Sequence, residues 1–364
     1  MSSLRSVLIA PDSFKGSLGA AEVAAAIARG WLSVRPDDHV TQLPQADGGE
    51  GTLDAIEAAV PGAQRHSAGM VTGPDGRPTP GEWLELPGGT AVVELAQASG
   101  LPLMTELDAG GSTTRGLGEV IRAALDAGAT SLLIGLGGSA STDAGTGALA
   151  ALGLRLLDAN GERLPDGGAR LTRLARVDRS DLLPPPSGGV ILLTDVTAPL
   201  LGPTGAAAVF GPQKGATPAD VENLELALAT VAAHLGLDPA GSGLGAAGGT
   251  AYGFVAEWAA HVVSGADHIA ELSGLDERIA DSDVMITGEG RFDEQSLTGK
   301  VVGQILGRAA RHGVATVVIA GAVQTSAPGH SESLTELAGS PEAAMAETAR
   351  WLEVAGANAA RAAG

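Results

Sequence analysis

The stretch VLIAPDSFKGS, residues 7–17, decides the fold of this protein. Its first four residues form a short apolar run that Pro11 ends, which is typical of a strand buried in a sheet. A polar loop then leads to good helix formers at residues 20–31. A buried strand followed by a loop and a helix predicts the first half of a strand–helix–strand unit.

The same rhythm continues on both sides of the middle of the chain. Residues 39–43 are predicted to form a second strand and residues 51–60 a second helix. After about residue 268 the pattern returns, with a strand at 283–287 that leads into a polar loop, a helix at 301–312 and a strand at 315–320. The tail from residue 340 reads as helical. Alternation of this kind favours a parallel sheet with helices on its faces.

The middle of the chain has a different pattern. Residues 68–98 contain three β-like runs separated by GPDG and PGG turns, which predicts an antiparallel meander. Further expected elements are helices at 116–127, 143–152, 224–235 and 251–263 and strands at 131–136 and 190–193. The chain has 364 residues, more than most single domains. We therefore expect an α/β protein with two domains. One is a discontinuous Rossmann- or flavodoxin-like domain (1–65 and 268–364), and the other is an inserted mixed α/β domain (66–267).

Composition excludes several classes of function. The net charge is −20, which disfavours binding to nucleic acid or to anionic membranes. The chain has no cysteine, so disulfides, thiolate catalysis and zinc–cysteine sites are excluded. Its first apolar run is too short for a signal peptide, and no run approaches the ~20 apolar residues of a membrane span. We expect a cytoplasmic protein that acts on small molecules.

Lysine is rare in this sequence, and its three positions share a feature. Of the 22 lysine and arginine residues, only three are lysines: Lys15, Lys214 and Lys300. Each of them lies next to a glycine. A compact ammonium beside flexible backbone suits a phosphate oxygen. The alternative is that they are ordinary solvated lysines near turns. This alternative explains one such lysine more readily than it explains all three.

Three loops follow predicted strands, where open α/β sheets bind ligands. Asp12 and Ser13 lie in the first, which could hold an anion at a helix N-terminus, with a plain helix cap by Ser17 as the alternative. The second is DGGEGT from Asp47, which fits a magnesium or hydroxyl site or else a solvated turn. The third, GLGGSASTD from Gly135, could form an amide nest for phosphate but lacks the lysine of a Walker A loop.

Two groups of carboxylates complete the set. Asp195 ends the strand at 190–193, a position for a general base or a metal ligand, with a turn aspartate as the alternative. Glu289, Asp293 and Glu294 precede Lys300 on one segment, which resembles a metal–phosphate arrangement. The seven histidines are scattered and support no zinc site.

Taken together, these segments resemble the type I glycerate kinase family of bacteria. The matching stretches run in family order across roughly residues 8–322: APDSFKGSL from Ala10, DGGEGT from Asp47, GLGGSASTDAG from Gly135, TDVTAPLLGPTGAAAVFGPQKGA from Thr194, GLGAAGG from Gly243 and TGEGRFDEQSLTGK from Thr287. The chain has Thr142-Asp143 and Ala198-Pro199 where the family often has Asn-Asp and Asn-Pro. The segment after Ala320 looks shortened.

The resemblance implies a two-domain kinase with its active site between the domains. It implies that ATP, with Mg²⁺, phosphorylates D-glycerate at the 2-hydroxyl to give 2-phosphoglycerate. The expected base is Asp195 with Asp47 as the second choice, and the expected metal ligands are Glu289 and Asp293. Lys15 is expected to act in catalysis. The remaining expected contacts are Asp12, Ser13, Lys214, Gly48, Gly49 and Lys300 for substrate, and Gly137, Gly138, Ser139, Thr142, Gly248 and Gly249 for the nucleotide.

Two other functions remain open from the sequence. One is a kinase for another small hydroxy acid, or for the 3-hydroxyl of glycerate. The other is a non-catalytic metabolite sensor on the same fold, although a full set of lysines and carboxylates disfavours it. The protein is expected to be a monomer or a homodimer.

Overall fold

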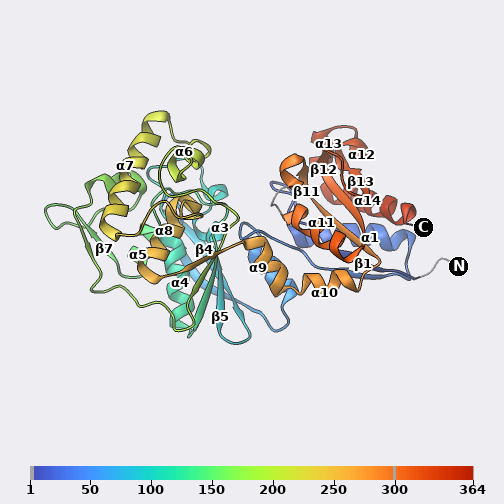
Figure 1. Ribbon diagram of the computed structural model, residues 1–364, viewed down its shortest axis with the longest axis horizontal. Helices are drawn as coiled ribbons and strands as arrows, with labels where there is room; N and C mark the ends of the chain where they lie inside the picture. The colour runs from blue at the N-terminus through green and yellow to red at the C-terminus, as the bar shows by residue number, and fades with distance from the viewer. Residues whose placement is uncertain (1–3, 298–300, 364) are drawn as a thin grey trace. The chain divides into compact units, whose positions relative to one another are not determined.

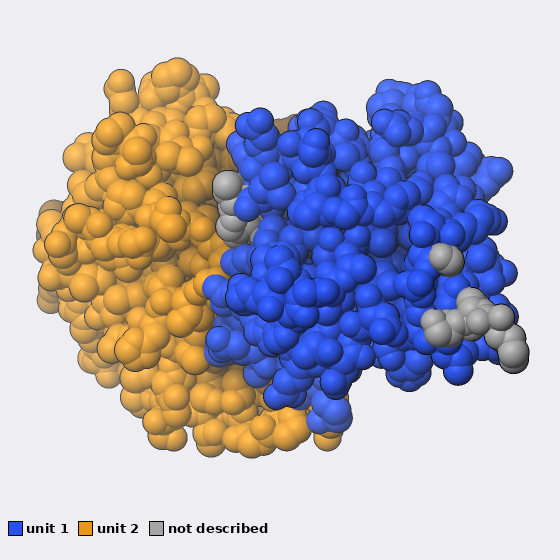
Figure 2. All heavy atoms as spheres, turned by 45° about the vertical axis from the view of Figure 1, so that its right-hand side comes forward, with its two compact units in different colours: residues 1–47, 54–61, 266–364 blue, residues 48–53, 62–265 orange. Residues whose placement is uncertain are grey.

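The computed structural model describes residues 4–297 and 301–363. The chain divides into two compact units, coloured separately in Figure 2. Unit 1 contains residues 1–47, 54–61 and 266–364, and unit 2 contains residues 48–53 and 62–265. Compared with the domain limits expected from the sequence, residues 48–53 and 62–65 lie in unit 2 and residues 266–267 in unit 1.

Unit 1 is built on a five-stranded sheet in which every neighbouring pair is parallel. Its strands are β1 (Ser6–Ile9), β2 (His39–Gln42), β11 (Val284–Phe292), β12 (Ala315–Val323) and β13 (His330–Ser333). They lie in the order β13-β12-β11-β1-β2. Counted along the sheet by chain position this is 2-1-3-4-5, the flavodoxin-like order. The expectation of a Rossmann- or flavodoxin-like parallel sheet is confirmed.

Helices cover both faces of this sheet (Figure 1). They are α1 (Ala20–Val34), α9 (Gly265–Leu272), α10 (Leu275–Ala280), α11 (Val301–His312), α12 (Leu334–Ala338), α13 (Pro341–Ala346) and α14 (Thr348–Ala362). Alternate side chains of β1 point to opposite faces. Val7 and Ile9 pack with α1 and α14, whereas Leu8 packs with α9, α10 and α11. Residues 7–10 form an uninterrupted apolar run because both faces of strand β1 are buried.

Helices α1 and α14 touch through glycine, although they lie at opposite ends of the chain. A Cβ added at Gly356 would lie 2.4 Å from the carbonyl oxygen of Ile27, and one at Gly30 would lie 2.0 Å from that of Glu353. The two backbones approach so closely that no side chain fits between them. Helix α14, near the end of the chain, therefore packs directly on helix α1, near its beginning.

Gly356→Ala is expected to destabilise unit 1 by roughly 1–3 kcal/mol, because the added methyl forces the two helices apart. Gly307→Ala, in α11, is the matched control, since a Cβ there meets nothing within 4 Å and alanine is the better helix former. Urea unfolding followed by circular dichroism compares the two. Equal shifts for both variants would contradict the close-packing argument.

Strand β11 differs from the sequence-based expectation. The strand was expected to end at Thr287 and to give way to a loop, but it runs on to Phe292. Residues 288–292 continue the pairing with residues 319–323 of β12. Glu289 and Arg291 therefore lie on a strand, and a short 3₁₀ turn follows at Glu294–Leu297. The parallel strands β12 and β13 are joined by residues 324–329 alone.

Unit 2 is built on a six-stranded mixed sheet in the order β10-β9-β6-β5-β4-β3. Its strands are β3 (Gln64–Thr72), β4 (Pro78–Leu86), β5 (Thr90–Glu94), β6 (Ser131–Gly135), β9 (Val190–Leu193) and β10 (His261–Val263), and a separate pair is formed by β7 (Arg155–Leu157) and β8 (Arg176–Asp178). Strands β3, β4 and β5 form the expected antiparallel meander, and β5, β6, β9 and β10 are parallel.

The helices of unit 2 enclose one large apolar core against the sheet. They are α3 (Leu95–Ser99), α4 (Arg115–Asp126), α5 (Thr146–Ala151), α6 (Ala206–Phe210), α7 (Pro218–Leu235) and α8 (Ala246–Trp258), with 3₁₀ turns at Leu101–Leu103, Gly168–Arg173 and Pro212–Lys214. Helix α2 (Thr52–Ala59) has residues in both units. No helix in the described part of the chain is long and apolar enough to cross a bilayer.

Two helices of unit 2 have different limits from those expected. The helix expected at 143–152 begins only at Thr146, because Ala144 and Gly145 have φ values of 53° and 71°. The helix expected at 251–263 ends at Trp258, and a kink at Ala247, Gly248 and Gly249, with φ values of 52°, 63° and 86°, divides its first turn from the regular helix that follows. Ala259, with φ of 50°, stops it, and the next residues pair with β9 as strand β10. Left-handed residues thus delay the start of one helix and end the other, and apolar periodicity does not reveal them.

Candidate functional site

Unit 1 contains a cavity of about 600 Å³ at the carboxyl ends of β1 and β11. From β1 the chain crosses to β2 on one side, whereas β11 lies on the other side, so this is the point where the strand order reverses. Open α/β sheets bind ligands at such a point. Of the residues expected from the sequence, it brings together Asp12, Ser13, Lys15, Asp47, Glu289 and Asp293.

The loop after β1 forms part of the cavity wall and is not the helix terminus expected from the sequence. Helix α1 begins at Ala20 with Gly19 as its N-cap, so residues 12–17 make a separate turn before it. Ser17 does not cap the helix, and its hydroxyl lies 2.5 Å from that of Thr348. Phe14 is buried and anchors the turn, whereas Lys15 is exposed at its tip.

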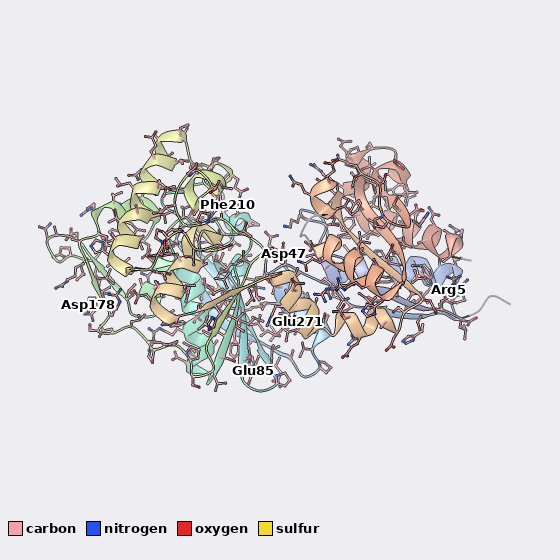
Figure 3. The ribbon with its side chains drawn as sticks, in the orientation of Figure 1. Arg5, Asp47, Glu85, Asp178, Phe210 and Glu271 are labelled. Carbon is pink, nitrogen blue, oxygen red and sulfur yellow. The ribbon has the colours of Figure 1, made fainter. Side chains whose placement is uncertain are left out.

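The electrostatics of Asp12 are strongly perturbed by its surroundings in the cavity. Burial and the negative charge of Asp47 raise its pKa to about 7, and the amide of Ser13 and the ammonium of Lys15 only partly oppose this shift. The negative charge of Glu289 raises it further. Asp47, labelled in Figure 3, follows β2 and is half-buried. A carboxyl whose pKa lies near neutrality can exchange a proton at physiological pH.

Glu289 and Asp293 line the same cavity but differ in their surroundings. Glu289 is buried near the end of β11. Asp293 caps the following 3₁₀ turn, since its Oδ1 accepts the amides of Gln295 at 2.9 Å and of Ser296 at 3.2 Å. Among residues 4–297 and 301–363, no three carboxylate or imidazole groups are placed to hold a metal ion by themselves.

Arg291 also lines the cavity and was not selected from the sequence. Arg291 lies inside the GEGRFDE segment, but a search for rare lysines does not select an arginine. The signal that could have found it is period-2 alternation. Glu289 and Arg291 are two residues apart on one strand, so their side chains leave the same face of the sheet. Lys300 lies outside the described residues.

In unit 2 the carboxyl ends of the parallel strands also carry polar residues. Asp195 follows β9 and is exposed, and its Oδ1 accepts a hydrogen bond from the hydroxyl of Ser264 at 2.8 Å and from the amide of Gly265 at 3.1 Å. Glu94 ends β5, and its carboxylate accepts the amides of Gly51 at 3.2 Å and Leu53 at 3.1 Å. The predicted loop DGGEGT is therefore divided, with Asp47 in unit 1 and the following residues in unit 2.

The glycine residues of these loops allow close backbone contacts. A Cβ at Gly48 would lie 2.7 Å from the carbonyl oxygen of Leu193, and one at Gly137 would lie 2.4 Å from the Cα of Gly49. The amide of Gly137 donates to the carbonyl of Gly48 at 2.9 Å. Gly138 has φ of 74°. At least one amide of the expected phosphate nest is thus already used within unit 2.

Lys214 is the centre of a buried polar cluster in unit 2. Its side chain is 2% exposed, and its Nζ donates to the hydroxyl of Ser139 at 2.8 Å and to the carbonyl oxygen of Ser141 at 2.5 Å. Burial lowers the pKa of Lys214 to about 8, and the negative charge of Asp143 opposes this shift. The hydroxyls of Ser141 and Thr142 are buried and have no hydrogen-bond partner within the described residues. Lys214 therefore stabilises the glycine-rich loop through hydrogen bonds to two of its residues, Ser139 and Ser141.

Asp143 was not selected from the sequence, yet it is fully buried in this cluster. Burial raises its pKa, while hydrogen bonds from the amide and hydroxyl of Thr114 and from the amides of Gly145 and Gly147 oppose the shift. Gly248 and Gly249 lie beside this loop. A Cβ at Gly248 would lie 2.2 Å from the carbonyl oxygen of Ser141, and the amide of Gly249 donates to Gly245 at 3.3 Å.

Comparison with known proteins gives one consistent result. The sequence model of the glycerate kinase family matches residues 7–364 of this chain. The chain is 44% identical over 305 residues to glycerate 2-kinase of Escherichia coli K12, covering 81% of this chain and 79% of that protein. It is 42% identical over 334 residues to glycerate kinase of Bacillus subtilis 168, covering 87% and 85% of the two chains.

The fold is also found among solved structures. A crystal structure of a Salmonella typhimurium LT2 protein, provisionally named glycerate kinase 2, matches with a TM-score of 0.81 and 36% sequence identity. The match covers 99% of this chain and 98% of that one. The likeness therefore extends over both units.

Proposed function

Because the chain belongs to the glycerate kinase family, we propose that it transfers the γ-phosphate of ATP to the 2-hydroxyl of D-glycerate, giving 2-phosphoglycerate and ADP. It is a phosphotransferase that uses ATP as phosphate donor and small molecules as substrates. The observation that carries the proposal is the unit 1 cavity, where Lys15, Arg291 and four carboxylates meet at the reversal of strand order.

Among the described residues, Lys15 and Arg291 supply the positive charge of this cavity. Phosphoryl transfer depends on positioning and on neutralising the charge of the transferred group. An ammonium binds phosphate oxygens as a point charge, and a guanidinium can bind two oxygens at once. Lys300 keeps the same proposed role. Ser13, Gly48 and Gly49 remain proposed contacts for substrate, whereas the burial of Lys214 and its bonds to Ser139 and Ser141 argue against a direct contact of its ammonium with substrate.

Asp12 was expected from the sequence as a substrate contact, and we now propose it as the base for the glycerate hydroxyl in place of Asp195 and Asp47. Burial and the negative charge of the neighbouring Asp47 raise the pKa of Asp12 to about 7. A general base works best when its pKa is near the working pH. The deprotonated carboxylate would accept the hydroxyl proton as the new O–P bond forms. Asp195 is the second candidate, because it is exposed at the carboxyl end of β9.

The donor groups of the cavity fit Mg²⁺. Asp12, Asp47, Glu289 and Asp293 are hard oxygen ligands, and they outnumber the two described cations of the cavity, so a triphosphate would meet an excess of negative charge. Mg²⁺ is commonly held by one or two carboxylates with phosphate oxygens and water, so a three-carboxylate cluster is not required. Glu289 and Asp293 are its proposed ligands. Bound Mg²⁺ would neutralise phosphate oxygens during transfer.

The proposal also places the enzyme in the cytoplasm, as a monomer or a homodimer. Size-exclusion chromatography with light scattering measures the oligomeric state directly.

The reaction is tested with the full chain, Mg·ATP and a panel of D-glycerate, tartronate, lactate and glycerol. We expect ADP release to be fastest with D-glycerate, and phosphorus NMR to identify 2-phosphoglycerate. A 3-phosphoglycerate signal would overturn the position of transfer. ATP binding without ADP release for any acceptor would overturn the kinase proposal in favour of a metabolite sensor.

A further inference from the structure

The unit 1 cavity has an apolar wall in addition to its charged residues. Leu334 of α12 and Pro341, Ala344 and Met345 of α13 line it. Leu334 and Ala344 are buried, whereas Met345 is 63% exposed. Met345 shares this wall with three other apolar residues, so the cavity has an apolar side suited to an apolar ligand group.

The apolar wall is connected to the loop that carries Lys15. The hydroxyls of Ser17 and Thr348 lie 2.5 Å apart, and Thr348 also donates to the carbonyl oxygen of Ala344 at 3.0 Å. Both hydroxyl residues line the cavity. One continuous surface thus runs from the ammonium of Lys15 to the thioether of Met345.

Glycerate cannot use both parts of this surface. It is a three-carbon acid whose hydroxyl and carboxylate groups need polar partners, and it offers no apolar face. ATP offers an anionic triphosphate and, at the other end, a flat heterocycle that packs well on aliphatic and thioether groups. The cavity volume of about 600 Å³ lies in the range of small-molecule sites.

Resting on the proposed function, we propose that the adenine base of ATP packs against Pro341, Ala344 and Met345 in unit 1, with its triphosphate toward Lys15 and Arg291. The C-terminal helices then form the nucleotide-base site. This differs from the expectation that the glycine-rich loop of unit 2 cradles the nucleotide. In unit 2 the amides of Gly137 and Gly249 are already donated to Gly48 and Gly245.

The test compares Mg·ATP with inorganic tripolyphosphate, which has the charge of the nucleotide tail but no base. We expect Met345→Asn to raise the Kd of Mg·ATP about fivefold or more in calorimetry, because apolar contact with the base is lost. The Kd of tripolyphosphate should change less than about twofold. The KM for D-glycerate should be similarly unaffected.

Two variants act as controls. Met345→Leu keeps an apolar side chain and should retain wild-type affinity for ATP. Met70→Asn removes a methionine of equal exposure, also 63%, from β3 in unit 2 and should leave both affinities unchanged. If Met345→Asn binds ATP as wild type does while D-glycerate is still phosphorylated, the base site is overturned and the proposed function stands. If wild type never releases ADP, the proposed function fails on its own, because the binding comparison does not depend on turnover.

Discussion

Asp12→Asn is expected to lower kcat for D-glycerate phosphorylation by about 10²–10⁴-fold, the usual contribution of a positioned general base. Asparagine preserves the shape of the side chain but cannot accept the proton. In the wild type, kcat/KM should rise with pH and level off above about pH 7, since only the deprotonated form of Asp12 acts as base. Steady-state kinetics across pH 5–9 measure both effects.

Asp12→Asn should raise the stability of the protein although it lowers kcat. The pKa of Asp12 is raised from 3.8 to about 7 in the folded protein, so its contribution to stability is complete below about pH 4 and is lost as pH rises to about 7. Asp12→Asn should therefore be more stable than wild type at pH 8, by roughly 1–3 kcal/mol. A variant that is more stable but much slower is the result expected when a carboxylate is kept for function and not for stability.

Two comparisons make this prediction specific. Asp37→Asn, at an exposed position of unit 1, should change neither activity nor stability appreciably. Asp195→Asn tests the second candidate base. If Asp195→Asn removes the pH-dependent step and Asp12→Asn keeps activity within a few-fold of wild type, the assignment of Asp12 is wrong.

Lys214→Met is expected to destabilise unit 2 by roughly 3–5 kcal/mol, as for other buried charges that lose a partner. Methionine fits the space, but Ser139 and the carbonyl of Ser141 lose their donor, and the buried Asp143 loses a nearby positive charge. Thermal unfolding monitored by circular dichroism should show the loss. The double variant Lys214→Met/Asp143→Asn should lose less than the sum of the single changes.

Measuring the free energy of unfolding across a pH series distinguishes a buried Lys214 from an exposed one. The pKa of Lys214 falls from 10.5 in the unfolded chain to about 8 in the folded protein. Between these values the unfolded chain binds more protons, so the wild type should gain stability from this group as pH rises from about 8 to about 10.5. Lys214→Met should lack that gain. Lys15→Met, at an exposed position, should behave as wild type in the same series, and equal losses in both variants would contradict the cluster.

Much of the fold could be predicted from the sequence. The apolar run at 7–10 and the helix formers after it indicated a parallel sheet, because a strand buried on both faces has few polar residues. The turns GPDG and PGG indicated the meander of unit 2. Periodicity failed where single residues adopt left-handed backbone, as at Ala144 and Ala259, and where the strand at Thr287 continues through polar residues.

The sequence by itself determined which chemical groups are present: three lysines beside glycines, carboxylates after strands, and motifs of the glycerate kinase family. Only the tertiary structure decided which of them share a cavity and which are buried. Asp12, Asp47 and Glu289 are far apart in sequence, yet parallel strands bring their carboxylates to one edge of the sheet. There burial and the negative charges of Asp47 and Glu289 raise the pKa of Asp12. Lys15 and Lys214 look alike in sequence, but one is exposed at a loop and the other is enclosed by its own unit. Burial and proximity set the electrostatics, and both arise from packing between distant segments.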